Sequence, residues 1–448
     1  MRSSIYNLRY KLKNNKYLLM NGCTGAMDEV DETVIQTLDL LNKETVNYNP
    51  SILKTLLERG YITSVTENEE IENMKKIAEI YQKVDQKLLQ VTIIPTYDCN
   101  FRCPYCYELK LHKNGQNWMN QQMSIETVNN IFEYLNREME KGRRIGEINL
   151  YGGEPFLKKN RKVIEQIIEH CKKSELTVMA ISNGYEIENY YDLIETKVIR
   201  EIQITLDGTG ELHNHRRKHM DGVPTYKKTL EVVDELLKRE IFVSLRTNID
   251  QENIEEISAL NTLFDEMGWS ENKYFRNYFK AVHTCYSKEE KPITDEDIVN
   301  KLIENKSIFT SALSGVAADI ATRIKYVVET GEYAYFKATY CGAVNGMLVF
   351  DPFGDIYPCW DTVGDNKHII GQINQYGLAY SPVYDQWMNR KPQNIAKCQT
   401  CAYILYCGGG CPAHARVINQ SIQTPYCDKY IEVFDKTVPQ IYEELIYK

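Results

Sequence analysis

Hydrophobic and polar residues follow two different patterns along the chain, and the pattern changes near residue 90. Before that point, NKYLLMNG and TGAMDEV read as short strands around a turn. DETVIQTLDLLNK has apolar residues at helical spacing, and SILKTLLERGYIT predicts a helix followed by a strand. The acidic stretch ENEEIEN predicts a solvated helix start. Residues 1–85 are therefore expected to form a small α+β unit.

From residue 90 onward, apolar strands alternate with amphipathic helices. The predicted strands are QVTIIPTYDC, EINLYGG, LTVMAISNG, EIQITLDG and IFVSLRTNID. Two of the helices between them are each expected to bury one apolar face. In the first helix this face carries Ile125, Val128, Ile131, Phe132 and Leu135. In the second helix it carries Val163, Ile164, Ile167 and Ile168. This alternation predicts an α/β domain with a parallel sheet. Residues 270–335 are expected to be mostly helical and to bridge to the C-terminal part.

Composition narrows the class of protein. The chain has 448 residues, 43% of them hydrophobic and 26% charged, which suits two or three globular domains. Its net charge of −9 argues against a broad nucleic-acid interface. The chain begins MRSSIYNLRY, without an apolar signal region, and no apolar run is long enough to span a bilayer. We expect a cytoplasmic protein that contacts neither nucleic acid nor membrane.

Three cysteines, Cys99, Cys103 and Cys106, form a C-x3-C-x2-C motif directly after the first strand of the α/β region. An iron–sulfur cubane normally takes four thiolates, so three thiolates leave one iron open to a small molecule. A zinc site more often has paired C-x2-C knuckles, and disulfides are rare in a chain without an export signal. The motif favours an open-iron cluster over those two alternatives.

Further polar and glycine-rich segments fall at the carboxyl ends of the predicted strands, where α/β barrels place their reactive groups. These segments are the cysteine loop, Gly152-Gly153-Glu154-Pro155, Ser182-Asn183-Gly184 and Asp207-Gly208. Their common placement predicts a single site at one end of the sheet.

The cysteine motif resembles the signature of the radical S-adenosylmethionine (radical SAM) enzymes. The resemblance implies a partial (β/α)6 TIM-like barrel whose open iron binds SAM, and a 5′-deoxyadenosyl radical that abstracts a substrate hydrogen. LYGGEP resembles the family segment that binds the methionine amino group, which implies roles for Gly152, Gly153 and Glu154. The other SAM-contact residues implied by position are Tyr105 near the adenine, Ser182, Asn183 and Thr205 at the ribose and carboxylate, and Arg217, or its neighbour Arg216, at the methionine carboxylate.

A second cysteine array occupies the C-terminal region. It reads C-x12-G-x4-C, then C-x2-C-x5-C-x3-C, then a last cysteine. This array looks like the SPASM domain, which carries auxiliary [4Fe–4S] clusters in peptide-modifying radical SAM enzymes, and zinc is the alternative. The resemblance assigns one cluster to Cys398, Cys401, Cys407 and Cys427, and the other to Cys341, Cys359 and Cys411. With only three thiolates, the latter cluster is expected to have an open iron.

The resemblance extends to three domains and to a reaction. Residues 1–85 resemble a winged-helix-like domain that binds the leader of a precursor peptide, and a dimerisation or packing domain is the alternative for them. Residues 90–310 resemble the radical SAM core, and residues 311–448 a bridging helix with the SPASM domain. We expect an oxidoreductase that installs thioether cross-links in a ribosomally made, Cys-containing peptide, with flavodoxin or ferredoxin as reductant.

Three other functions remain possible at this stage. They are a sulfatase maturase, a carbon–carbon cross-linking peptide maturase and a non-enzymatic electron carrier. Sulfatase maturases have an aspartate base directly after the second SPASM cysteine, where this chain has Trp360, with Asp361 one residue further on. That displacement weakens the sulfatase interpretation. The polar residues at the strand ends argue against the electron carrier, which would have no SAM pocket.

Overall fold

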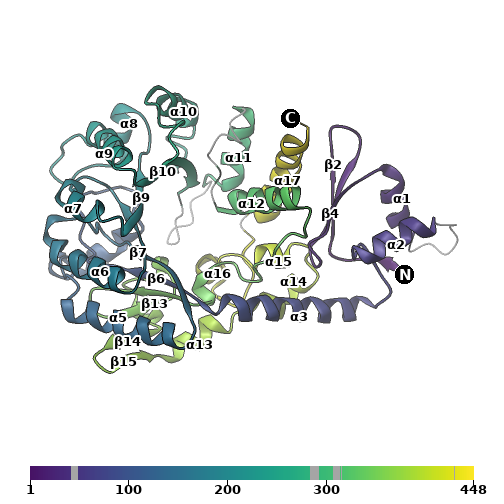
Figure 1. Ribbon diagram of the computed structural model, residues 1–448, viewed down its shortest axis with the longest axis horizontal. Helices are drawn as coiled ribbons and strands as arrows, with labels where there is room; N and C mark the ends of the chain where they lie inside the picture. Colours follow the sequence, from purple (N-terminus) through teal and green to yellow (C-terminus); the bar gives the residue numbers. More distant parts are fainter. Residues whose placement is uncertain (42–48, 283–291, 306–312, 314, 428, 448) are drawn as a thin grey trace. The chain divides into compact units, whose positions relative to one another are not determined.

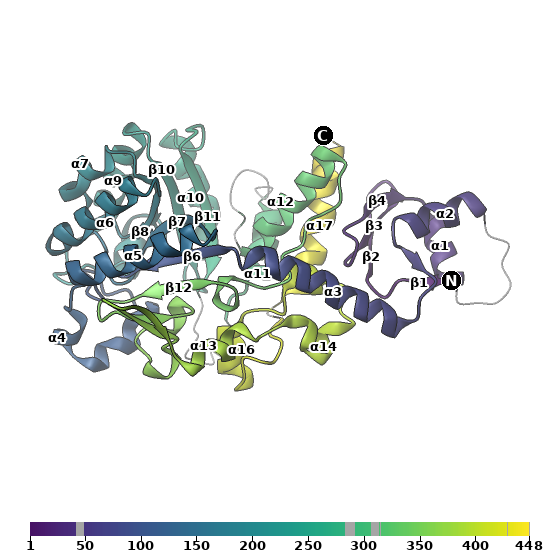
Figure 2. The same cartoon turned by 60° about the horizontal axis from the view of Figure 1, so that its bottom comes forward.

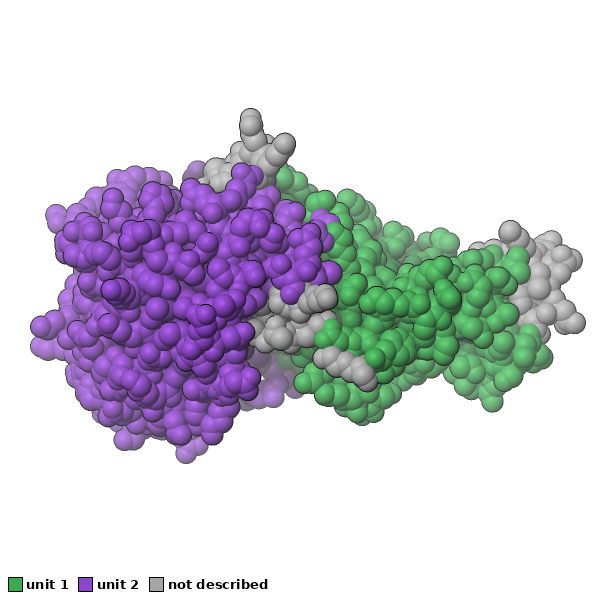
Figure 3. Space-filling model, turned by 90° about the horizontal axis from the view of Figure 1, so that it is seen from above, with its two compact units in different colours: residues 1–86, 314–341, 390–448 green, residues 87–313, 342–389 purple. Residues whose placement is uncertain are grey.

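The computed structural model describes residues 1–41, 49–282, 292–305, 313, 315–427 and 429–447. Its contacts divide the chain into two compact units, coloured separately in Figure 3. Unit 1 comprises residues 1–86, 314–341 and 390–448, and unit 2 comprises residues 87–313 and 342–389. In the described segments, no helix is long and apolar enough to cross a membrane. The three domain boundaries drawn from the sequence stay predictions.

Unit 2 is built on a sheet of ten strands among the described residues, in the order β11-β10-β9-β8-β7-β6-β12-β13-β14-β15. Strands β6 to β11 run parallel and in sequential order, and β12 joins β6 in parallel before three antiparallel strands complete the sheet. The strands are β6 (Leu88–Ile93), β7 (Arg144–Leu150), β8 (Val178–Ser182), β9 (Ile199–Thr205), β10 (Phe242–Ile249), β11 (Phe275–Ala281), β12 (Met347–Phe350), β13 (Asp355–Tyr357), β14 (Gly371–Asn374) and β15 (Gly377–Tyr380). The predicted α/β class with a parallel sheet is confirmed.

Helices connect the parallel strands, and α6, α7 and α9 lie on the outer side of the sheet (Figures 1 and 2). The helices of this unit are α4 (Gln116–Met119), α5 (Ile125–Glu140), α6 (Arg161–Lys173), α7 (Tyr191–Ile194), α8 (Gly210–Arg216), α9 (Tyr226–Lys238), α10 (Glu256–Glu266), α11 (Asp295–Glu304) and α13 (Pro382–Met388). The predicted buried face of α6 is confirmed at all four positions.

Two predictions for this unit are wrong in part. Ile125 is exposed rather than buried, because it is the first residue of α5, directly after the N-cap Ser124, and the helix packs its later turns against the sheet. The stretch 270–335, expected to be mostly helical, contains the strand β11, which pairs in parallel with β10. The pattern of FRNYFKA is too short and too polar to reveal a strand that is stabilised mainly by its neighbour.

Unit 1 contains a three-stranded antiparallel sheet of β2 (Asn7–Lys11), β3 (Tyr17–Asn21) and β4 (Met27–Val30), and a pair formed by β1 (Arg2–Ser3) and β5 (Ile62–Thr63). Its helices are α1 (Glu32–Leu40), α2 (Pro50–Glu58), α3 (Glu67–Asp85), α12 (Gly315–Thr330), α14 (Ala396–Gln399), α15 (Ile404–Cys407), α16 (Pro412–Asn419) and α17 (Tyr430–Ile446). A core of Leu19, Leu38, Leu56 and Tyr61 joins β3 to α1 and α2.

Side-chain caps mark the starts of α1, α2 and α3 in unit 1. Thr66 and Glu69 form a reciprocal capping box at the start of α3, which satisfies two of the backbone N–H groups that every helix start leaves unpaired. Strands β3 and β4 were predicted from the sequence. Strand β2 was not predicted, although NLRYK alternates polar and apolar residues as a half-buried strand does.

Candidate active site

The loop after β6 carries the C-x3-C-x2-C motif. Cys103 is buried, and Cys99 and Cys106 are half-buried. Burial raises the pKa of all three thiols, that of Cys106 to about 12, so these groups keep their protons until a metal displaces them. The Cys99 sulfur accepts hydrogen bonds from the backbone N–H of Phe101 at 3.3 Å and from Asn183 Nδ2 at 3.7 Å. Donors of this kind to cysteine sulfur are typical of iron–sulfur sites.

The start of this loop is anchored by an aromatic stack. Tyr97 is fully buried, and its hydroxyl donates to Asp351 Oδ2 at 3.0 Å. Its ring stacks on Trp118 at 4.8 Å, and Trp118 stacks on Phe353 at 5.1 Å. The cysteine loop is therefore held by residues from β12 onward as well as by those next to it in sequence.

Gly152 and Gly153 bring the end of β7 against the backbone of the cysteine loop. The Gly153 N–H donates to the Thr96 carbonyl at 3.2 Å, and a Cβ on Gly153 would lie 2.1 Å from the Asp98 carbonyl oxygen. Gly152 has φ +112°, a conformation that disfavours other residues, and its Cβ would meet Ile94 at 2.4 Å. Close packing alone therefore requires glycine at both positions, whether or not either residue also contacts SAM.

Glu154 ties this segment to the end of β8. Its carboxylate accepts hydrogen bonds from Ser182 Oγ at 2.7 Å, from the Asn183 N–H at 2.7 Å and from the Phe156 N–H at 2.9 Å. Burial raises the pKa of Glu154 to about 7, against the lowering effect of these hydrogen bonds. The predicted site residues Glu154, Ser182 and Asn183 therefore form one connected network.

Arg217 and Tyr105 meet beside Cys103. Arg217 Nη1 lies 3.3 Å from the Cys103 sulfur and 3.4 Å from the Tyr105 hydroxyl. The Tyr105 hydroxyl also hydrogen-bonds to Asp207, whose other oxygen accepts from the Asn248 N–H at 2.8 Å. The pKa of Tyr105 is raised by burial and then by the Asp207 charge.

The neighbouring Arg216 has other partners. It is 1% exposed and pairs with Asp250 at 2.7 Å and with Glu252 at 3.0 Å. Both candidate arginines lie at the cysteine loop. Arg217 contacts the Cys103 sulfur, whereas the Arg216 guanidinium lies 5.1 Å from the centre of the Tyr105 ring and is paired with the two carboxylates.

The other predicted residue, Thr205, is buried at the end of β9. Sequence reasoning did not select Asn100, whose side-chain oxygen accepts from Asn183 Nδ2 at 2.7 Å, nor the bond between Asp207 and Tyr105. The position of Asn100 inside the cysteine motif and that of Asp207 at a strand end were the available signals.

All cysteines of the second array except Cys359 lie in unit 1, where glycines allow their segments to approach. A Cβ on Gly408 would lie 2.1 Å from the backbone of Thr339, and one on Gly410 would lie 1.6 Å from the carbonyl oxygen of Tyr426. These approaches bring the segment of Cys407 and Cys411 against the segments that end at Cys341 and Cys427.

Four of these thiols interact electrostatically. Burial raises the pKa of Cys398 to about 11, and Cys401 and Cys427 raise it further. Burial likewise raises the pKa of Cys407 to about 12, with Cys427 and Cys401 among the contributors. These four are the residues that the sequence assigns to one auxiliary cluster. Across the described parts of the chain, no three His, Cys, Asp or Glu side chains converge as the ligands of a single metal ion do.

Cys359 lies in unit 2, in the turn after β13, with its Sγ 3.9 Å from Asp361 Oδ2. The Asp361 carbonyl accepts from Lys110 Nζ at 2.8 Å. The Trp360 ring meets that of Tyr151 edge to face at 5.8 Å, and Tyr151 directly precedes Gly152. Trp360 therefore faces the end of β7 at the site.

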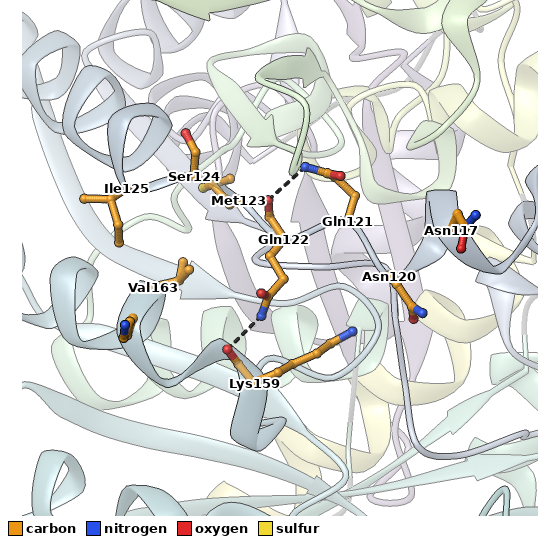
Figure 4. A pocket seen from close by; sticks show the side chains of 10 residues that line it. Asn117, Asn120, Gln121, Gln122, Met123, Ser124, Ile125, Lys159 and Val163 are labelled. Carbon is orange, nitrogen blue, oxygen red and sulfur yellow. Dashed lines mark hydrogen bonds between the residues drawn. The ribbon is translucent and has the colours of Figure 1, made fainter.

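A polar cavity of about 520 Å³ lies on the same unit, between the loop after α4 and the start of α6 (Figure 4). Gln122 Nε2 donates to the Lys159 carbonyl across it at 2.7 Å. The ten described residues that line it include no cysteine and none of the predicted SAM-contact residues.

Comparison with known proteins agrees with this geometry. Residues 93–263 match the model of the radical SAM superfamily. The radical SAM domain thus spans the parallel strands from the cysteine loop to α10, and such a domain implies a [4Fe–4S] cluster and SAM. Among curated proteins, the chain is 25% identical over 177 residues to a GTP 3′,8-cyclase of Nautilia profundicola, of which it spans about half (51%, and 38% of this chain). It is 21% identical over 364 residues to a cysteine-type anaerobic sulfatase-maturating enzyme of Clostridium perfringens, covering 77% of this chain and 94% of that one.

Solved structures share the fold beyond the radical SAM domain. The structure of anSMEcpe with AdoMet and the Cp18Cys peptide has a TM-score of 0.62 at 18% identity, covering 80% of this chain and 99% of that one. Streptococcus suis SuiB has a TM-score of 0.54 at 17% identity, covering 95% of this chain and 98% of that one, and SuiB has also been solved with its precursor peptide SuiA. The chain therefore shares the fold of these two proteins over most of its length.

Proposed function

We propose that this protein is a cytoplasmic radical SAM peptide maturase that forms thioether cross-links in a ribosomally made, Cys-containing precursor peptide. The observation that carries the proposal is the shared fold with SuiB over 95% of this chain. Residues 1–86 of the 448 make up nearly a fifth of the chain, so most of this N-terminal segment lies within the match. The fold shared with anSMEcpe is less extensive than the one shared with SuiB, because it leaves 20% of this chain uncovered.

Cys99, Cys103 and Cys106 would hold the SAM-binding cluster. When bound, the cluster and SAM would supply a 5′-deoxyadenosyl radical that takes a carbon-bound hydrogen from the peptide. The donors aimed at the Cys99 and Cys103 sulfurs fit thiolate ligands of this kind.

The residues around the cluster would bind and orient SAM. Arg217 would grip the methionine carboxylate, because a guanidinium can donate two charge-assisted bonds to it. The backbone of Gly152 and Gly153 and the side chain of Glu154 would receive the amino group. Tyr105 would border the adenine. Ser182, Asn183 and Thr205, at adjacent strand ends, would contact the ribose and carboxylate.

The N-terminal sheet would hold the leader of the precursor. Strand β4 lies at an edge of the three-stranded sheet, and an extended peptide can add to such an edge through main-chain hydrogen bonds. Asp28 and Glu29 on β4 are paired with Arg59 and Lys16, at 2.7 Å in both cases, so the strand presents few unpaired charges to a peptide.

Two auxiliary clusters would sit in the second cysteine array. Cys398, Cys401, Cys407 and Cys427 would complete one, and Cys341, Cys359 and Cys411 would hold the other with three thiolates. The fourth iron of the latter would be open to the thiolate of a substrate cysteine, which is the reason to favour thioether formation. Flavodoxin or ferredoxin would supply electrons.

Sulfatase maturation is the second candidate, favoured by the similarity to the Clostridium perfringens enzyme. Against it stands Trp360, which faces Tyr151 at the position where those maturases have an aspartate. A carbon–carbon cross-linking maturase shares every feature except the use of the open iron.

The test is anaerobic incubation of the reconstituted protein with SAM, a reductant and the Cys-containing peptide encoded beside its gene. We expect release of 5′-deoxyadenosine, loss of two hydrogen atoms per cross-link, and protection of that cysteine from alkylation. A cross-linked product with a free thiol would indicate carbon–carbon bonding. Conversion of a sulfatase cysteine to formylglycine, with the precursor unchanged, would overturn the proposal.

A further inference from the structure

One buried cation lies between the cysteine-bearing segments of unit 1. Arg390 is 1% exposed. Its Nε donates to the Ile422 carbonyl at 2.5 Å, and its Nη2 donates to the carbonyls of Gly409 at 2.7 Å and Thr424 at 3.2 Å. Among the described residues, no carboxylate is within ion-pair distance of it, and its buried Nη1 has no hydrogen-bond partner.

The carbonyls that Arg390 binds belong to cysteine-bearing segments. Gly409 lies between Cys407 and Cys411, and Thr424 lies three residues before Cys427. The side chain therefore ties together the backbones that present these three thiols.

Burial lowers the pKa of the Arg390 guanidinium, and negative charge on Cys341, Cys398, Cys411 or Cys407 would raise it. Cys398 and Cys407 belong to one predicted ligand set, and Cys341 and Cys411 belong to the other. A buried guanidinium without a counter-charge is strongly unfavourable in a folded protein. Neutral thiols offer no such counter-charge, whereas clusters held by thiolates carry net negative charge.

We propose that Arg390 is the positive charge that balances the two auxiliary clusters and sets their reduction potentials. Reduction adds an electron to a cluster, so a nearby fixed cation stabilises the reduced form and raises the potential. The Nε and Nη2 bonds to backbone carbonyls would hold the guanidinium in place, and its charge would be available to the clusters. This inference rests on the auxiliary clusters of the proposed function.

The test is a redox titration of the full-length, anaerobically reconstituted protein, followed by electron paramagnetic resonance. We compare the wild type with Arg390→Gln, which removes the charge, and with Arg390→Lys, which keeps it. At the wild-type midpoint of the auxiliary clusters, Arg390→Gln should lower the ratio of reduced to oxidised cluster about tenfold, a shift of about 59 mV for one electron. Arg390→Lys should stay near the wild type, and the SAM-binding cluster should not shift in either variant.

Arg323→Gln is the matched control, because Arg323 is also buried in unit 1 but is paired with Asp319 at 3.1 Å. Unchanged auxiliary potentials in Arg390→Gln, or an equal shift in Arg323→Gln, would overturn the inference. If Arg390→Gln does not retain the iron of the auxiliary clusters, the iron content and potential of Arg390→Lys decide whether the charge role holds. Retained iron at the wild-type potential supports the charge role, and loss of the iron in both variants overturns it. Wild-type protein with iron for a single cluster would instead refute the auxiliary clusters themselves.

Discussion

The guanidinium of Arg217 lies 3.3 Å from the thiol sulfur of Cys103, although 114 positions separate the two residues in sequence. This contact joins the end of α8 to the cysteine loop after β6. It leaves a fixed cation beside the site where an anionic group of SAM would bind.

Replacing Arg217 by Gln should weaken SAM binding about thirtyfold, because a hydrogen bond to a charged group contributes about 2 kcal/mol. Equilibrium dialysis under anaerobic conditions measures this, with iron content as a check that the cluster is intact. Arg216→Gln is the control. It should lower the free energy of unfolding by about 3 kcal/mol, because it leaves Asp250 unpaired. It should weaken SAM binding less than Arg217→Gln does, because Arg216 contacts the Tyr105 ring and not the Cys103 sulfur. Unchanged SAM affinity in Arg217→Gln would contradict the assignment.

Replacing Gly153 by Ala should displace the cysteine loop, because the added carbon would lie 2.1 Å from the Asp98 carbonyl oxygen. We expect a loss of about 1–3 kcal/mol in stability and reduced iron at the SAM-binding site. Gly146→Ala, within β7, is the control, since the nearest neighbour of the added carbon would lie 3.9 Å away. Thermal unfolding and iron analysis report both effects, and equal behaviour of the two variants would refute the close-approach argument.

Replacing one cysteine of the C-x3-C-x2-C motif should prevent the whole SAM-binding cluster from forming. Cys103→Ala should lose about four iron atoms per chain and all cleavage of SAM. Cys171→Ala should keep both, because Cys171 is buried in the core on α6 and is not a predicted ligand. Iron analysis and 5′-deoxyadenosine release are the measurements. A wild-type iron content in Cys103→Ala would contradict the assignment of Cys103 as a cluster ligand.

Asp351 should make stability depend on pH. Burial raises the pKa of Asp351 from 3.8 to about 7, and the nearby Asp355 adds to the shift. The folded state binds this proton more tightly than the unfolded state, so its stabilising contribution is complete below about pH 4 and is lost as the pH rises through 7. The change amounts to at most about 4 kcal/mol.

Asp351→Asn should remove this dependence. An amide stays neutral, and its oxygen can still accept the N–H groups of Phe353 and Asp355. Thermal unfolding of both proteins between about pH 5 and about pH 8 should give a shallower decline for the variant. Parallel curves would mean that Asp351 does not titrate in this range.

Much of the site could be predicted because its signals are local. Three cysteines within eight residues set the number of thiolates whatever the rest of the fold does, and glycines next to a strand end mark a close approach. The choice between Arg216 and Arg217 could not be predicted, because adjacent residues differ only in the direction that the end of α8 gives them. Arg390 carried no signal, since only the folded chain reveals that its neighbours are carbonyls and thiols.

The sequence by itself determined the alternation of strands and helices, the spacing of the cysteines in both arrays and the glycines that let backbones approach. Those features depend on residue type and on short-range periodicity. The tertiary structure decided which arginine reaches Cys103, that β11 is a strand, that Ile125 is exposed and that a buried cation lies among the auxiliary cysteines. Such features depend on which distant segments meet, and hydrogen bonding and burial fix that only when the whole chain is folded.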